Sequence, residues 1–151
     1  MDWNNARKPI EMTTITTTYD GDMRLRTEVG HHVLTIDVPP EMGGRDRGPT
    51  PPQLFVASLG SCVAAYVASY CDRAGIDDTG LEVDVVFDKA EDPTRLVNLR
   101  IVVRLPNGSC GDRLEALRRV AEHCPVHATI STLEQVSIEI NDRTALAGAA
   151  V

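Results

Sequence analysis

The sequence predicts an α+β fold in which antiparallel strands surround one long apolar helix. Segments in which apolar and polar residues alternate occur in clusters rather than singly between helices, as in α+β proteins. One segment without charges, residues 53–71, is long enough for about five helical turns. The chain has 151 residues, a usual length for one domain, so we expect residues 1–151 to form a single domain.

Composition and charge narrow the function classes. Hydrophobic residues make up 42% and charged residues 25% of the chain, as in soluble globular proteins. The 15 basic and 22 acidic residues give a formal net charge of −7, which argues against a phosphate-binding surface, so no nucleic-acid partner is expected. The first residues show no apolar leader, and four cysteines in such a chain favour a reducing, cytoplasmic location.

The N-terminal part predicts a three-stranded meander. Residues 12–19 are rich in threonine and β-branched side chains, and residues 23–29 and 33–38 alternate in strand-like fashion, with turn residues between the three segments. In the last of these segments the apolar residues form one face. Asp37 is therefore expected on the opposite face, away from the core.

A long loop and a long helix come next. The loop, residues 39–52, holds five of the nine prolines, and an ordered loop of this length is often functional. The helix predicted over residues 53–71 has 14 apolar residues among its nineteen and no charge. Pro52 suits its first turn, and Gly75 suits its end.

This helix raises the question of a membrane span and of a partner. Its length permits a span, but its apolar residues are largely alanines diluted by serines, and alternating strands flank it, so no membrane partner is expected. A helix that is uncharged on every side must be buried on every side. A domain of this size has difficulty covering it alone, so we expect a homodimer that encloses the helices of both subunits.

The C-terminal part predicts a hairpin, two helices and a final strand. The hairpin alternates in both arms, and the first helix has an apolar face. A Cys-Pro pair interrupts that helix and allows a second one to start. The predicted segments are strands 81–87 and 97–105, helices 112–123 and 125–133, and a last strand marked by Val136, Ile138 and Ile140.

Two of the four cysteines point inward from predicted helices. Cys62 lies midway along the apolar helix, and Cys71 is half a helical turn out of phase with it, which excludes a disulfide between them within one straight helix. Cys124 shares the apolar stripe of the helix before it. Because Cys124 also precedes Pro125, its sulfur should lie at a helix N-terminus, a position that lowers a thiol pKa, and His127 lies one turn further on.

Other roles for these thiols stay open. A cysteine in an alanine-rich helix is commonly an inert buried residue, and this reading is kept for Cys71 and for Cys110, which lies in a polar turn and should be exposed. Cys124 and His127 have the spacing of half a zinc site. A closed zinc site needs four ligands, and no second pair completes it, so neither a metal nor another cofactor is predicted.

Two motifs surround the inward-pointing cysteines. The first is GPTPPQLF, residues 48–55, followed by ASLGSC, which ends at Cys62. The second is CPVHATI, residues 124–130. Together they resemble the OsmC/Ohr family of thiol peroxidases. The spacing of the two cysteines and the order of strands around them also agree, so the resemblance covers nearly the whole chain.

The resemblance implies a single OsmC-like domain and an intertwined homodimer in which antiparallel sheets wrap two central helices. It implies that Cys62 attacks an organic or inorganic hydroperoxide and becomes a sulfenic acid. Cys124 then condenses with that sulfenic acid to form a disulfide, and an external dithiol, lipoyl-type in family members, reduces the disulfide.

The sequence departs from the family at the groups that activate the thiolate. Archetypal members use an arginine from the first strands and a glutamate before the helix, whereas the alignment places Pro52 at the glutamate position, with the neutral Gln53 beside it. The alignment places the archetypal arginine at or near Gly21. The candidates to replace these groups are Arg24 and Arg26, then Arg45 and Arg47 in the loop, together with His127.

These departures leave alternatives to the peroxidase. One is a non-peroxidase OsmC-like dimer that binds a small apolar or thiol-reactive ligand at the subunit interface. The other is a purely structural role. The missing acid favours the ligand-binding alternative, and the paired inward cysteines favour the peroxidase, because a ligand pocket needs neither thiol.

Overall fold

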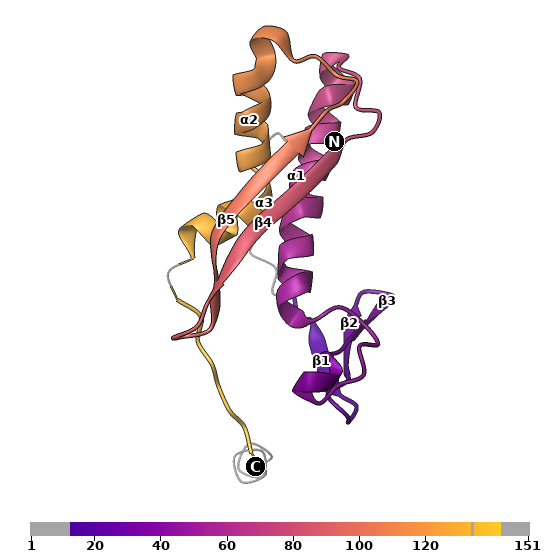
Figure 1. Ribbon diagram of the computed structural model, residues 1–151, viewed down its shortest axis with the longest axis vertical. Coiled ribbons are helices and arrows are strands. Elements are labelled where there is room, and N and C mark those ends of the chain that lie inside the picture. Colours follow the sequence, from indigo (N-terminus) through magenta and orange to yellow (C-terminus); the bar gives the residue numbers. More distant parts are fainter. Residues whose placement is uncertain (1–12, 134, 143–151) are drawn as a thin grey trace. The chain divides into compact units, whose positions relative to one another are not determined.

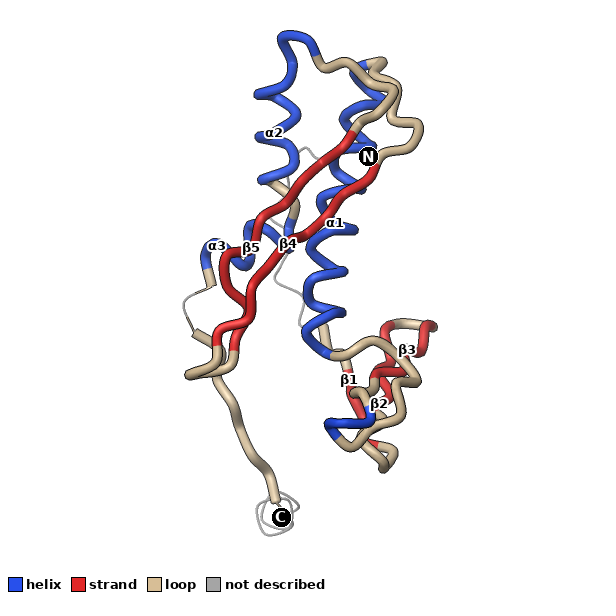
Figure 2. Tube along the Cα trace, viewed as in Figure 1, coloured by secondary structure: helices blue, strands red, loops and turns tan. Residues whose placement is uncertain are grey.

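The computed structural model describes residues 13–133 and 135–142 of the chain (Figures 1 and 2). They belong to two compact units, Met1–Ala57 and Ser58–Val151, which we describe separately. Helix α1, Pro51–Ala74, begins in the first unit and continues through the second. The mixture of helices and antiparallel strands confirms the predicted α+β class.

The first unit holds the predicted meander. Strands β1 (Thr16–Tyr19), β2 (Leu25–Val29) and β3 (His32–Ile36) pair antiparallel in the order β1-β2-β3. The first strand starts later than predicted, and residue 12 lies outside the described residues. The turn between β1 and β2 places Asp22 and Met23, as well as the glycine before them, at positive φ.

The loop between β3 and α1 folds back onto β3 around Asp37. This carboxylate is completely buried, which corrects the expectation that Asp37 faces away from the core. One of its oxygens, Oδ1, accepts the N–H of Val38 at 2.8 Å. The other, Oδ2, accepts the N–H of Arg45 at 3.2 Å, and from Arg47 it accepts both the N–H, at 3.1 Å, and Nε, at 2.6 Å. A buried charge with this many partners ties the two ends of the loop together.

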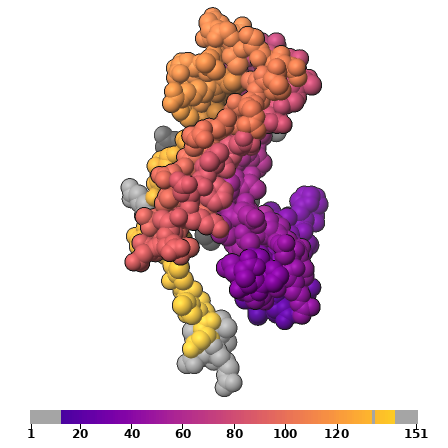
Figure 3. All heavy atoms as spheres, in the orientation of Figure 1, coloured from indigo at the N-terminus to yellow at the C-terminus, as the bar shows by residue number. Residues whose placement is uncertain are grey.

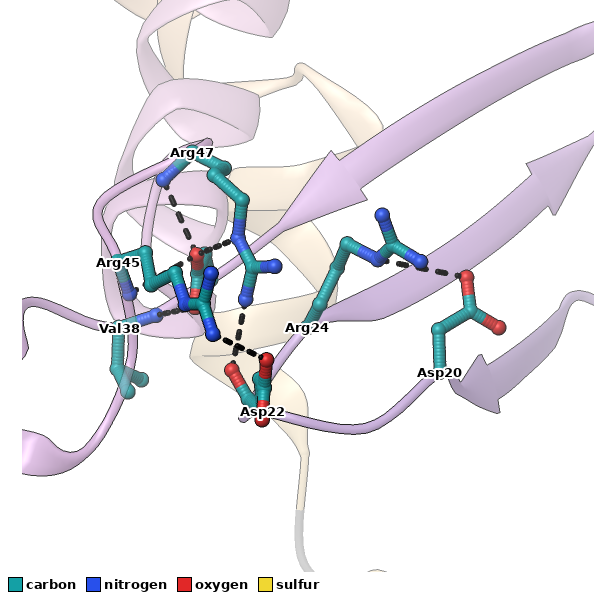
Figure 4. Close-up of polar contacts among 7 residues, drawn as sticks. Asp20, Asp22, Arg24, Val38, Arg45 and Arg47 are labelled. Atoms are coloured by element: carbon teal, nitrogen blue, oxygen red, sulfur yellow. Dashed lines mark hydrogen bonds and ion pairs between the residues drawn. The ribbon is translucent and has the colours of Figure 1, made fainter.

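Arginines of the loop also reach the turn between β1 and β2, as Figure 4 shows. Arg45 pairs with the carboxylate of Asp22 at 2.8 Å, and the guanidinium of Arg47 donates to the backbone oxygen of Asp22 at 2.7 Å. The loop comes so close to β3 that a Cβ at Gly44 would lie 1.9 Å from the oxygen of Val38. Only glycine fits at such a close approach.

Helix α1 is capped at both ends. At its start Gln53 Oε1 accepts the N–H of Thr50 at 2.7 Å, while Thr50 Oγ1 accepts the N–H of Gln53 at 3.4 Å, which is a capping box. At its end Gly75 takes φ +66°. The N–H of Ile76 then bonds to the oxygen of Cys71 at 2.9 Å, which completes a Schellman motif.

One stripe of α1 is buried within the chain. Its residues recur every four positions, as expected for one helical face: Leu59, Val63, Val67 and Cys71. The exposed side of α1 in the second unit carries small uncharged residues, among them Ser61, Ala65 and Ser69. By length and composition α1 could cross a membrane, a test that the core helix of a soluble protein also passes.

In the second unit a hairpin and two short helices pack around this stripe. Strands β4 (Glu82–Ala90) and β5 (Arg95–Arg104) form the hairpin, and helices α2 (Leu114–Glu122) and α3 (Pro125–Thr132) follow the one-turn helix η2 (Gly111–Arg113). The buried core consists of the α1 stripe, Leu117 and Cys124. Apolar residues of β4 and β5 pack against it.

The predicted final strand is wrong for the single chain. Residues 135–142 form no strand, and Val136, Ile138 and Ile140 are 70%, 86% and 85% exposed. This segment, yellow in Figure 3, projects from the rest of the second unit. A strand needs a neighbouring edge for its N–H and C=O groups, and the described chain offers no edge paired with these residues.

The buried carboxylate of Asp37 gives a prediction about stability. Arg47, which donates to it, holds the pKa of Asp37 well below its ordinary value of 3.8, against the opposing effect of burial. Asp37→Asn keeps the size of the side chain and removes its charge, so we expect the melting temperature to fall by about 5–10 °C. The matched control, Asp22→Asn, loses only an exposed ion pair and should shift it by less than about 2 °C.

The lowered pKa of Asp37 also predicts how the stability of the protein depends on pH. Because the pKa of Asp37 is lowered on folding, its stabilising effect is complete above about pH 5 and is lost as the pH falls through and below its ordinary value. The difference between wild type and Asp37→Asn should therefore narrow on acidification. Thermal melts from pH 3 to 7 measure it. The assigned role of Asp37 would be contradicted if Asp37→Asn and Asp22→Asn lowered the melting temperature equally. It would also be contradicted if the difference in melting temperature between wild type and Asp37→Asn widened at low pH.

Candidate functional site

The second unit brings Cys62 and Cys124 together. Cys62 lies midway along α1, half-buried against the core to which the fully buried Cys124 belongs. Cys62 lies close enough to Cys124 to contribute to the raised pKa of the Cys124 thiol. All four cysteines of the chain are free thiols in this structure. Two neighbouring thiols in one core, one of them partly accessible, are candidates for disulfide formation.

The Cys-Pro sequence produces the position of Cys124. Helix α2 ends at Glu122, and Cys124 takes an extended conformation, φ −63° and ψ 139°, before α3 starts at Pro125. The sulfur of Cys124 accepts the backbone N–H of His127 at 3.3 Å and so serves as the N-cap of α3. The prediction that the sulfur lies at a helix N-terminus is confirmed.

The expectation that this position gives Cys124 a lowered pKa is wrong, because burial outweighs the helix N-terminus. The pKa of Cys124 is raised, first because burial disfavours the thiolate and further because Cys62 contributes a hydrogen bond and a charge. The N–H of His127 acts in the opposite direction but does not prevail. Cys124 therefore keeps its proton at neutral pH.

The ring of His127 is directed to the end of α2. Its Nδ1 lies 2.8 Å from the backbone oxygen of Glu122, and because a carbonyl oxygen can only accept, Nδ1 carries the proton. The contact of His127 with the sulfur of Cys124 runs through its backbone N–H. The structure thus gives this residue a positioning contact with the thiol that does not depend on the charge of the ring.

The candidate arginines belong to the first unit, where each has a carboxylate partner. Arg24 and Arg26 both place Nε 3.8 Å from a carboxylate oxygen of Asp20, and Arg26 also pairs with Glu28. Figure 4 shows Arg24 beside Asp20. Arg45 and Arg47 are held by Asp22 and Asp37. An effect of these arginines on Cys62 stays a prediction.

Sequence reasoning missed the roles of Gln53 and Asp37. Gln53, which lies beside the expected glutamate position, caps the start of α1. The first turn of this helix, which carries Cys62 further along, contains no acidic side chain. Asp37 holds the loop that leads to this helix. Its signal was the pair Arg45 and Arg47 in a glycine-rich loop, which can fold back and neutralise a buried acid.

A largely apolar cavity of about 950 Å³ lies in the second unit between β5 and the helices. The residues that line this cavity include Cys110 and His127 but neither Cys62 nor Cys124. Among the described residues, 13–133 and 135–142, no three side chains suited to a metal ion cluster together. The chemistry that the site offers is that of thiols.

The raised pKa of Cys124 can be measured by alkylation. We expect the pH midpoint for its reaction with iodoacetamide in the native protein to lie above the ordinary value of 9.0. Cys62→Ala should lower that midpoint, since it removes the neighbouring thiol, yet leave it above the ordinary value because burial is the largest cause.

Peptide mass spectrometry follows each cysteine separately in this experiment. Cys110→Ala is the control and should leave the Cys124 midpoint unchanged. A wild-type midpoint at or below 9.0 would show that the helix N-terminus, not burial, governs this thiol.

Comparison with known proteins identifies the family. The family model described as "OsmC-like protein" matches residues 43–141, a segment that contains both Cys62 and Cys124. Comparison with the curated proteins found no match. Among solved structures, the chain is similar to a protein from Psychrobacter arcticus 273-4, provisionally described as an osmotic stress induced and detoxification response protein. That similarity has a TM-score of 0.69 and 25% identity over 79% of this chain and 88% of the other.

Two further structures show the same fold. An OsmC-like protein from Mycoplasma pneumoniae has a TM-score of 0.66 and 21% identity, over 88% of this chain and 96% of the other. An organic hydroperoxide resistance protein OsmC from Legionella pneumophila has a TM-score of 0.58 and 20% identity, over 83% of this chain and 93% of the other. Because the family model spans well over half of the sequence, this chain belongs to the OsmC-like protein family.

Proposed function

We propose that this chain is a two-cysteine thiol peroxidase that reduces organic or inorganic hydroperoxides. The observation that carries the proposal is that Cys62 packs against the core to which Cys124 belongs, close enough to contribute to the raised pKa of Cys124. Membership in the OsmC-like family supports it, and so do relatives of the same fold that are named organic hydroperoxide resistance proteins, from Legionella pneumophila and Bacillus subtilis.

In the proposed first step Cys62 is the nucleophile because it is the more accessible of the two thiols. Its thiolate attacks one oxygen of the O–O bond, which breaks, and the alcohol leaves after taking up a proton. Cys62 becomes a sulfenic acid. Cys124, whose raised pKa keeps it protonated, donates a hydrogen bond to the Cys62 sulfur before the attack.

In the second step Cys124 resolves the sulfenic acid. Its sulfur attacks the Cys62 sulfur, the S–O bond breaks, and the departing hydroxide takes the Cys124 proton and leaves as water. An external dithiol, of lipoyl type by the resemblance, then reduces the disulfide by two thiol exchanges. In this scheme Arg24, Arg26 and His127 are the candidates that favour the reactive form of Cys62, and no cofactor takes part.

The cavity in the second unit supports a second candidate, a non-peroxidase dimer that binds a small apolar or thiol-reactive ligand. Its volume suits a drug-sized molecule, its lining is mainly apolar, and neither Cys62 nor Cys124 lines it. The two candidates differ in one observable property. The peroxidase consumes hydroperoxide, whereas the binding protein leaves hydroperoxide unchanged.

We also propose that residues 1–151 form one OsmC-like domain that acts as a cytoplasmic homodimer. Two exposed surfaces support an association that would cover them. One is the uncharged side of α1 with its small residues, and the other consists of the apolar residues Val136, Ile138 and Ile140. In the single chain only one stripe of α1 is buried, and a homodimer would bury more of this helix.

Turnover with t-butyl hydroperoxide and a dithiol tests the peroxidase. Cys62→Ser should reduce consumption to the uncatalysed background. Cys124→Ser should react once, lose multiple turnover, and accumulate a sulfenic acid on Cys62 that dimedone captures. Cys110→Ser is the control and should retain wild-type turnover. Undiminished consumption by Cys62→Ser would remove Cys62 from the chemistry, and a wild type that leaves hydroperoxide untouched would favour the binding protein.

The oligomeric state tests the homodimer. Ala65→Arg places a charge on the small-residue side of α1, so light scattering after gel filtration should show a shift from dimer to monomer. The control, Thr94→Arg, adds the same charge in the exposed loop between β4 and β5 and should stay dimeric. A wild type that elutes as a monomer would be incompatible with the proposed assembly.

A further inference from the structure

The two cysteines that the peroxidase scheme leaves unused lie near one another in the second unit. Cys71 is in the last turn of α1 and is completely buried. Cys110, expected at an exposed turn, is half-buried and packs against the core that contains Cys71. Burial raises the pKa of Cys71, and the charges of Cys110 and Asp78 add to this effect.

Contacts on both sides of Cys110 fasten its loop to the end of α1. The guanidinium of Arg113 donates to the backbone oxygen of Ala74 at 2.8 Å. The amide of Asn107 donates to the backbone oxygen of Thr79 at 2.9 Å. Gly108 sits so close that a Cβ there would lie 2.4 Å from the oxygen of Asp77. These contacts hold Cys110 beside the helix end that carries Cys71.

We propose that Cys71 and Cys110 are a second redox-active dithiol, which a low-molecular-weight disulfide closes into an intrachain disulfide. Cys110 is the entry point because it is partly accessible and lines the cavity. Its thiolate attacks one sulfur of the small disulfide, whose S–S bond breaks, and one small thiolate leaves. Cys71 then attacks Cys110 in the mixed disulfide, gives its proton to the second small thiolate, and releases it as a thiol.

This second pair is chemically separate from the first. Cys71 follows Cys62 by nine residues on α1, which is about 13.5 Å along the helix axis and half a turn around it. The Cys71–Cys110 bond would link the end of α1 to the segment before α2, and α1 and α2 both contribute to the buried core. A cross-link that closes such a long loop is expected to raise the stability of the chain.

The test uses the Cys62→Ser/Cys124→Ser double variant, in which only Cys71 and Cys110 can react. Treatment with oxidised glutathione should give a product lighter by two hydrogen atoms, which intact mass spectrometry detects. Digestion without reductant should yield one peptide pair that joins Cys71 to Cys110. The melting temperature should rise by about 5–10 °C and return to its starting value with dithiothreitol.

Adding Cys110→Ser to this variant provides the control. Its remaining thiol, Cys71, is buried, so the mass should stay unchanged after oxidised glutathione. In the double variant, a stable adduct of one glutathione on each chain would show that Cys71 cannot reach Cys110. Two unreacted thiols, or a disulfide between two chains, would equally overturn the proposal. None of these outcomes bears on the peroxidase, because both of its cysteines are absent.

Discussion

The proximity of Cys62 and Cys124 in the core of the second unit is the feature on which the proposed chemistry of this protein depends. It requires a helix that passes through the core with one buried stripe, and a break between α2 and α3 that turns a cysteine inward. Burial raises the pKa of Cys124, so this thiol carries its proton at neutral pH and faces a more accessible neighbour. In the proposed peroxidase, their surroundings alone would therefore assign different roles to two chemically identical side chains.

A second constraint acts in the first unit. The buried carboxylate of Asp37 is neutralised by Arg47 and by backbone N–H groups of its own loop. The loop it organises ends in the capping box of α1, and so the geometry of the helix start is set by Asp37, Thr50 and Gln53 together. Arg24, Arg26, Arg45 and Arg47 are all engaged with carboxylates of this unit.

Much of the fold could be predicted from the sequence because its signals are local. Pro52 and Gly75 mark the ends of α1, alternation marks the β4–β5 hairpin, and Cys124-Pro125 marks the break between helices. Properties that depend on distant residues were not predictable in this way. Alternation alone placed Asp37 outside the core, because the covering loop contributes nothing to the local pattern. Residues 136–140 alternate like a strand, but pairing requires an edge that their own sequence does not supply.

In the candidate site, too, local features could be predicted from the sequence, whereas features that depend on distant residues could not. The motifs singled out Cys62 and Cys124, which pack in one core. The sign of the pKa shift of Cys124 depends on how deeply the core buries it, and burial outweighs the helix N-terminus there. Peptide mapping without reductant, after one equivalent of t-butyl hydroperoxide, tests the central pairing most directly. A cross-link between Cys62 and Cys124 as the first product is the predicted result. A first product that lacks this cross-link, whether it joins Cys71 to Cys110, joins two chains or contains no disulfide, would contradict it.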